Sequence, residues 1–105
     1  MLLAMRCSGE SAYELARRLL LRSLLVLKQG TRSSGFWITP HKVAKINKVS
    51  GRAIGRFIHM LLSELEKEGL VQGMNTGSRR YSKKYYVKLD NVDKCIEYLR
   101  RTKYL

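Results

Sequence analysis

The sequence predicts an α+β fold whose elements follow the order helix, strand, helix, helix, strand, strand, helix. Two patterns carry this prediction. Apolar residues recur at helical spacing over residues 54–65, and Tyr85 and Val87 alternate with polar neighbours at the period of two that is typical of a half-buried strand. The chain has 105 residues, so we expect a single domain over 1–105 that buries a core without metal or disulfide.

The first helix is predicted over residues 11–28. Ser11 precedes it, Glu14 occupies the position of a capping-box acid, and Gly30 follows its end. Leucines in its second half spread apolar surface around most of the helix. Such a helix has to be covered on more than one side, so we expect the C-terminal helix or a partner to pack on it.

A short strand at residues 36–38 precedes two helices over residues 39–69. Thr39 and Pro40 form a start signal for a helix that runs to about Asn47. Ser50 is expected to cap a longer helix that Gly69 stops.

The segment 70–89 reads as a hairpin with strands at 70–74 and 82–89 and a basic tip at 75–80. Asp90 or Asn91 is expected to cap a last helix, 91–102. Its apolar face would hold Val92, Cys95, Ile96 and Leu99.

Two helices joined by a short turn and followed by a basic hairpin resemble a winged helix-turn-helix domain. Ala44 stands where such motifs want a small residue, and Val49 where they want an apolar contact. The close Leu-Glu-Lys-Glu-Gly-Leu-Val, residues 65–71, is similar to the end of the recognition helix in bacterial and archaeal winged-helix regulators. Lys48 departs from the pattern, since many members carry Gly there. The resemblance implies DNA binding.

Charge placement gives an independent argument. The 21 Lys and Arg against 8 Asp and Glu leave a net charge of +13, for which a polyanionic partner is the commonest reason. Residues 39–63 and 71–89 each contain five basic residues and no acid, whereas three acids gather at 64–68. This segregation is typical of a phosphate-binding face.

We therefore expect the first half of the helix 50–68 to enter a major groove of double-stranded DNA. Arg52 and Arg56 would reach guanine edges or phosphates, and Ser50 and Gly51 would bring backbone N–H groups to a phosphate. Gly55 either permits close approach to DNA or is an indifferent surface glycine. The remaining contacts are assigned to Lys42, Lys45, Lys48, Arg79, Arg80, Lys83 and Lys84, the last four on the wing at 75–84.

Other readings stay open. Residues 38–40, Ala44 and the close of the long helix also resemble a winged-helix protein of small ribosomal subunits, whose Lys-rich N-terminal tail is not present here. An RNA-bound component, or an accessory subunit of a replication or transcription complex, is thus an alternative to a small regulator or chromatin protein. A homodimer through the Leu-rich first helix and the C-terminal helix is expected for a regulator.

Several classes of protein are not supported by the sequence. The N-terminal apolar run is too short for a signal peptide, and Arg22 interrupts a stretch already too short to span a bilayer. Cys7 and Cys95 lack the spacing of a zinc site and are expected to be free thiols in a reducing cytoplasm. No catalytic constellation or phosphate loop is visible, so neither an enzyme nor a cofactor nor a metal is expected. The expected location is the cytoplasm, with the nucleoid.

Overall fold

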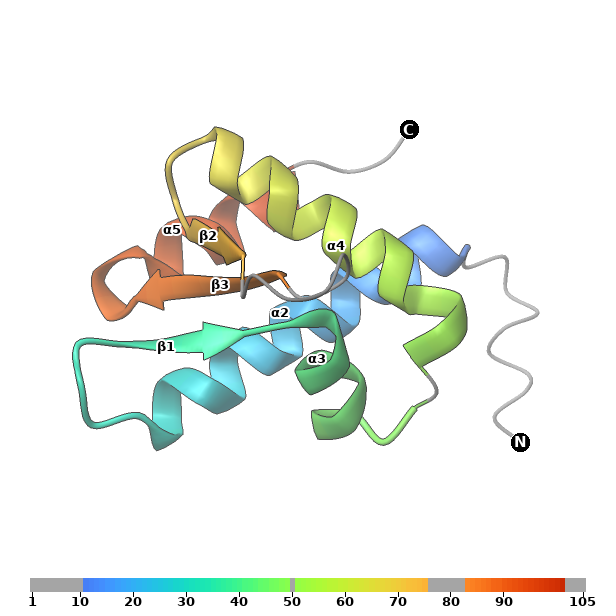
Figure 1. Cartoon of the computed structure of the whole chain (residues 1–105), viewed down its shortest axis with the longest axis horizontal. Helices are drawn as coiled ribbons and strands as arrows, with labels where there is room; N and C mark the ends of the chain where they lie inside the picture. Colours follow the sequence, from blue (N-terminus) through green and yellow to red (C-terminus); the bar gives the residue numbers. More distant parts are fainter. Residues whose placement is uncertain (1–10, 50, 76–82, 102–105) are drawn as a thin grey trace.

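The chain forms four helices and three strands within residues 11–49, 51–75 and 83–101, the part that the computed structural model describes (Figure 1). The elements, in order, are α2 (Ala12–Gly30), β1 (Gly35–Ile38), α3 (Pro40–Ile46), α4 (Gly51–Lys67), β2 (Gln72–Asn75), β3 (Lys83–Lys88) and α5 (Leu89–Arg101). The predicted α+β class and element order are confirmed, and this topology is compatible with a winged helix.

Two of the predicted helix starts are formed by side-chain caps. Ser11 Oγ accepts a hydrogen bond from the Glu14 N–H at 3.1 Å, and Thr39 Oγ1 accepts one from the Lys42 N–H at 3.0 Å. Each cap satisfies a backbone donor that the first helical turn leaves free. Pro40 occupies the first turn of α3, where its missing N–H costs nothing.

The first helix, α2, begins one residue later than predicted and ends two residues later, at Gly30. Its buried side chains are Ala16, Leu20, Ser23 and Leu24, and the helix packs against α4 and α5. The expectation that the C-terminal helix packs on α2 is thus confirmed. Leu25 and Val26 remain 44% exposed each. Within the described residues, no helix combines the length and apolar character needed to cross a bilayer.

The turn between α3 and α4 has a left-handed residue. Lys48 has φ 55°, a conformation that glycine adopts freely and L-residues rarely adopt. This explains why the resembling family often carries Gly there. Val49, for which an apolar contact is expected, is 40% exposed, and its N–H bonds the Ala44 carbonyl at 3.0 Å.

Helix α4 ends at a left-handed glycine, as the stop signal predicted. Gly69 has φ 76°, and the Gly69 and Leu70 N–H groups bond the Glu66 and Leu65 carbonyls at 2.9 Å each. Because Leu70 belongs to this cap, β2 begins only at Gln72 rather than at the predicted residue 70.

The three strands form an antiparallel sheet in the order β1-β3-β2, with β3 in the centre. Phe36 and Ile38 of β1 and Tyr85 and Val87 of β3 are buried and join the core residues of the helices. The predicted alternation along β3 is confirmed. The predicted cap at Asp90 or Asn91 is wrong, because α5 already begins at Leu89 and both residues lie in its first turn.

Candidate nucleic-acid interface

The helix-turn-helix segment presents a group of exposed cations. Lys42 and Lys45 lie on α3, Lys48 in the turn and Arg56 on α4, and all four side chains are exposed. Helices α3 and α4 pack against each other. The small residue Ala44 is 5% exposed on α3, as close packing of two helices requires. The two helices therefore pack through their buried residues, and their cations face solvent.

These four cations are available to an external anion. None of the ion pairs among described residues includes Lys42, Lys45, Lys48 or Arg56. Lys42 Nζ donates to the Trp37 carbonyl at 3.2 Å, a bond to a neutral acceptor that leaves its charge uncompensated. Unpaired surface cations of this kind are what a phosphate backbone attracts.

The start of α4 is described in part. Gly51 and Arg52 lie in its first turn, with no description of their side chains, and Ser50 lies outside the described residues. Gly55 lies one turn further along, and a Cβ added there would meet no atom within 4 Å. The surface around Gly55 is therefore open, as both readings of this glycine require.

The two described wing lysines have partners within the chain. Lys83 Nζ lies 3.2 Å from Glu66 Oε1 of α4, and Lys84 Nζ lies 4.4 Å from the centre of the Trp37 ring. The structure therefore does not bring Lys83 together with the cations of the helix-turn-helix. Arg79 and Arg80 of the predicted tip lie outside the described residues.

A polar stripe on α4 holds the wing strands. His59, Ser63 and Glu66 follow one another at helical spacing and all contact the sheet. The Tyr85 hydroxyl lies 3.3 Å from both Ser63 Oγ and His59 Nε2, and Glu66 Oε2 accepts from the Gly73 N–H at 3.2 Å. The i, i+4, i+7 spacing of these polar residues is the signal that the sequence offers for this contact.

A second surface lies on the side of the sheet turned away from the core. We call it the outer sheet face. It consists of Trp37, Gln72, Met74, Lys84, Tyr86 and Lys88, none of which is buried. Trp37 lies between buried Phe36 and Ile38 on β1 and so points to the side of the sheet away from the core.

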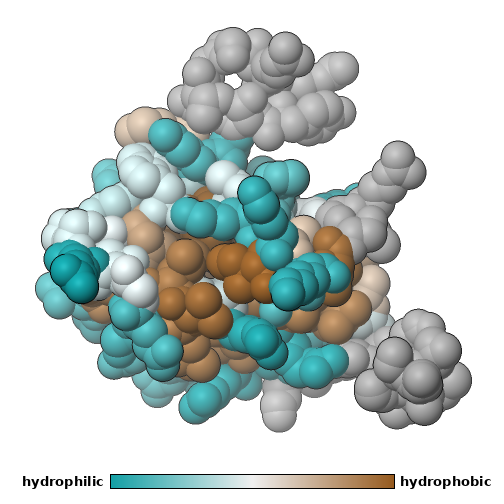
Figure 2. Space-filling view, turned by 90° about the horizontal axis from the view of Figure 1, so that it is seen from below, coloured by the Kyte–Doolittle hydropathy of each residue, from teal (hydrophilic) through white to brown (hydrophobic). Residues whose placement is uncertain are grey.

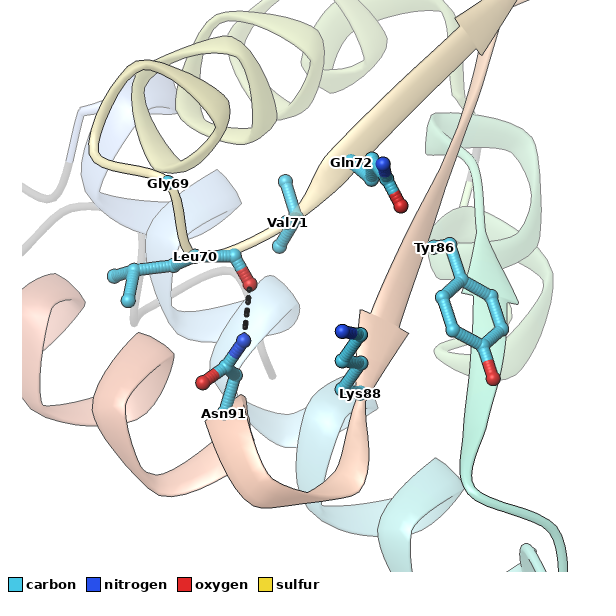
Figure 3. Close-up of a pocket in the computed structure, with 7 residues that line it drawn as sticks. All are labelled: Gly69, Leu70, Val71, Gln72, Tyr86, Lys88 and Asn91. Carbon is cyan, nitrogen blue, oxygen red and sulfur yellow. Dashed lines mark hydrogen bonds between the residues drawn. The ribbon is translucent and has the colours of Figure 1, made fainter.

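A cavity of about 310 Å³ opens at one end of this face (Figure 3). Its lining comes from the loop after α4, from β2 and β3, and from α5: Gly69, Leu70, Val71, Gln72, Tyr86, Lys88 and Asn91. Asn91 Nδ2 donates to the Leu70 carbonyl at 3.4 Å. The volume lies at the lower end of the range of about 300–1,000 Å³ that is usual for ligand pockets.

Metal-ligating and reactive groups are sparse. Among described residues, no group of three or more His, Cys, Asp or Glu side chains is placed to hold a metal ion. Cys95 is buried, and burial raises the pKa of its thiol to about 11, so it is a poor nucleophile at neutral pH. His41 is exposed on α3, and Cys7 lies outside the described residues.

Comparisons of this chain with protein-family models, with curated proteins and with solved structures found no match. The function of the candidate interface therefore has to be inferred from the geometry and charge of its own residues.

Proposed function

We propose that this protein binds double-stranded DNA through the helix-turn-helix of α3 and α4 and through the basic wing at 75–84. In this proposal it is a small transcriptional regulator or a chromatin-associated protein of the cytoplasm. The N-terminal half of α4 lies in a major groove, and the wing contacts the neighbouring minor groove or its phosphates.

The observation that carries the proposal is the exposed, unpaired state of Lys42, Lys45, Lys48 and Arg56. They lie on α3, in the following turn and in the first half of α4, in a chain of net charge +13. Each cation that neutralises a phosphate releases counterions, which makes a duplex a favourable partner at moderate salt.

The cations have different expected tasks. Arg52 and Arg56 lie one turn apart on α4 and have the planar fork that pairs with guanine O6 and N7. Lys42, Lys45 and Lys48 act on phosphates as point charges. The arginines therefore contribute sequence preference, and the lysines contribute affinity that depends on salt.

The test is a fluorescence-anisotropy titration with duplex DNA between about 50 and 200 mM salt. We compare the double variants Arg52→Ala/Arg56→Ala and Arg79→Ala/Arg80→Ala, and the single variant Lys45→Ala. At least one double variant should lose about 1 kcal/mol or more of binding free energy. Lys45→Ala should reduce the slope of log K against log salt by about 0.9.

Lys94→Ala is the matched control, because Lys94 is exposed on α5 and carries the same charge. It should leave the slope and the affinity close to those of the parent protein. If Lys94→Ala weakens binding as much as Lys45→Ala, or if neither double variant weakens binding, the proposed interface is wrong.

The proposal includes a homodimer through α2 and α5. Exposed Leu25 and Val26 on α2 support it. Figure 2 looks at the side on which α2 lies in Figure 1, and hydrophobic residues gather in the middle of that face with hydrophilic ones around them. A symmetric regulator needs two recognition helices related by a two-fold axis, which a dimer supplies.

An RNA-bound component, or an accessory subunit of a replication or transcription complex, is the alternative. The aromatic and basic character of the outer sheet face favours it, because sheets of this kind occur on RNA-binding platforms. Sequencing the nucleic acid that co-purifies with the protein from cells separates the candidates. Discrete duplex sites support a regulator and uniform genomic DNA an architectural protein, whereas ribosomal RNA would contradict the DNA proposal.

A further inference from the structure

The outer sheet face contains an aromatic pair that lies outside the hydrophobic core. Trp37 of β1 and Tyr86 of β3 are paired in register, and their ring centres lie 5.0 Å apart with planes at 60°. The buried face of the same strands already supplies Phe36, Ile38 and Val87 to the core. Large aromatic side chains left partly exposed on a sheet offer ring faces and edges to a ligand.

Cations accompany this pair. Lys84 Nζ lies 4.4 Å from the centre of the Trp37 ring, Lys42 Nζ reaches the Trp37 carbonyl at 3.2 Å, and Lys88 is exposed at the end of β3. The outer sheet face contains no acid. Glu66 of α4 pairs with Lys83, whose side chain lies on the other side of the sheet. The face is thus complementary to a ligand that combines flat rings with negative charge.

The cavity extends this surface. Tyr86, Lys88 and Gln72 belong to the outer sheet face and also line the cavity (Figure 3). Asn91 Nδ2 is engaged with the Leu70 carbonyl, which leaves the Asn91 amide oxygen and the Gln72 amide as polar groups at the lining. A ring that passes Tyr86 therefore reaches hydrogen-bonding groups.

We propose that the outer sheet face binds single-stranded DNA. Bases stack on Trp37 and Tyr86, and the backbone phosphates pair with Lys84, Lys88 and Lys42. A duplex hides the faces of its bases, so only an unpaired strand uses the rings. The inference shares Lys42, Lys84 and the DNA ligand with the proposed function, but it rests on the aromatic rings of the sheet rather than on the outer side of α4.

A base can stack on the Trp37 ring only if the Lys84 ammonium moves off that ring. The energies of the two contacts permit this exchange. An exposed cation–π contact contributes about 0.5–1 kcal/mol, whereas stacking of a base on an aromatic residue contributes about 1–3 kcal/mol. The displaced ammonium then pairs with a phosphate. Exchange of the lysine for a base is therefore favourable.

The chain offers a direct measurement, because Trp37 is its one tryptophan. We titrate the full protein with short oligo(dT) and record tryptophan fluorescence, with a duplex of equal length and tripolyphosphate as comparison ligands. We expect saturable quenching by oligo(dT) and little quenching by the other two, because neither presents free base faces.

Variants then test the assigned residues. Tyr86→Ala should weaken oligo(dT) binding by at least about fivefold, whereas Tyr86→Phe, which keeps the ring, should bind like the parent. Lys84→Ala should weaken binding at low salt. Lys94→Ala, which removes the same charge from the exposed side of α5, is the control and should leave the quenching curve unchanged.

Three results would overturn the inference: no saturable quenching by oligo(dT), equal quenching by tripolyphosphate, or tighter binding of oligo(rU) than of oligo(dT). A purely structural aromatic pair would lower stability in Tyr86→Ala without any quenching in the parent. If the proposed function were wrong, the arginine double variants would keep the duplex affinity of the parent while quenching by oligo(dT) persisted. This result differs from failure of the present inference.

Discussion

Lys83 of β3 and Glu66 of α4 form an ion pair with 3.2 Å between Nζ and Oε1. The second oxygen of the same carboxylate accepts the Gly73 N–H of β2 at 3.2 Å. One side chain of α4 therefore holds both wing strands. It also compensates a charge that the DNA proposal assigns to the interface.

Glu66→Gln tests this compensation. The amide oxygen still accepts from Gly73, and the ion pair is lost between side chains 31% and 35% exposed. We therefore expect less than about 1 kcal/mol of destabilisation. Duplex affinity should rise, because Lys83 becomes available and one negative charge is removed. Anisotropy titrations should give a larger rise than for Glu97→Gln, the same charge change on exposed α5; equal changes would contradict the prediction.

Gly35→Ala and Gly55→Ala form a matched pair. A Cβ at buried Gly35 would press on the Val87 carbonyl oxygen and lie 2.6 Å from the Tyr86 hydroxyl, so denaturant unfolding should show a loss of about 1–3 kcal/mol. Gly55 has open space, and alanine there should raise stability by about 0.5–1 kcal/mol. If Gly35→Ala left the free energy of unfolding unchanged, the strands β1 and β3 would have to move apart easily. A drop in duplex affinity for Gly55→Ala would place this glycine against DNA, and an unchanged affinity would make it an indifferent surface residue.

Leu25→Glu tests the dimer. Leu25 is 44% exposed in the single chain, so the substitution should change folding stability little while it places a charge in the proposed interface. Light scattering should show a dimer for the parent and a monomer for the variant. Gln29→Glu adds the same charge at another exposed position of α2 and should remain dimeric. A monomeric parent would contradict the dimer directly.

The Cys95 thiol should be protected in the folded chain. With a pKa of about 11 in the fold against 9.0 for a free thiol, the thiolate is on the order of a hundredfold rarer in the folded state near pH 8. In a Cys7→Ser background, reaction with a thiol reagent should therefore be slow until denaturant is added. The fold binds this proton more tightly than the unfolded chain, so stability should decline as pH rises from about 9 towards 11. Rapid native labelling would show that the site opens readily.

Local signals predicted much of the fold. Thr39, Pro40 and Gly69 act within one turn of their own position, so their effect is readable from neighbouring residues. The alternation around Tyr85 and Val87 is likewise local. The starts of β2 and α5 were misplaced because the Gly69 cap includes Leu70 and because the Leu89 N–H bonds the distant Ser34 carbonyl at 2.8 Å.

The candidate site was less predictable for the same reason. Exposure of Lys42, Lys45 and Arg56 follows from helical periodicity, which a sequence shows. The pairing of Lys83 with Glu66, and of Trp37 with Tyr86, depends on strand register and on how α4 crosses the sheet. These are tertiary relationships that no local pattern encodes.

The left-handed turn at Lys48 has a consequence for stability and for surface charge. A left-handed L-residue costs roughly 1–2 kcal/mol, and glycine would avoid that cost apart from its greater freedom in the unfolded chain. A linker that had only to join two packed helices would gain from glycine at this point. The left-handed lysine instead places an exposed positive charge in the turn between the two helices, and the backbone strain is the cost of keeping a cation there.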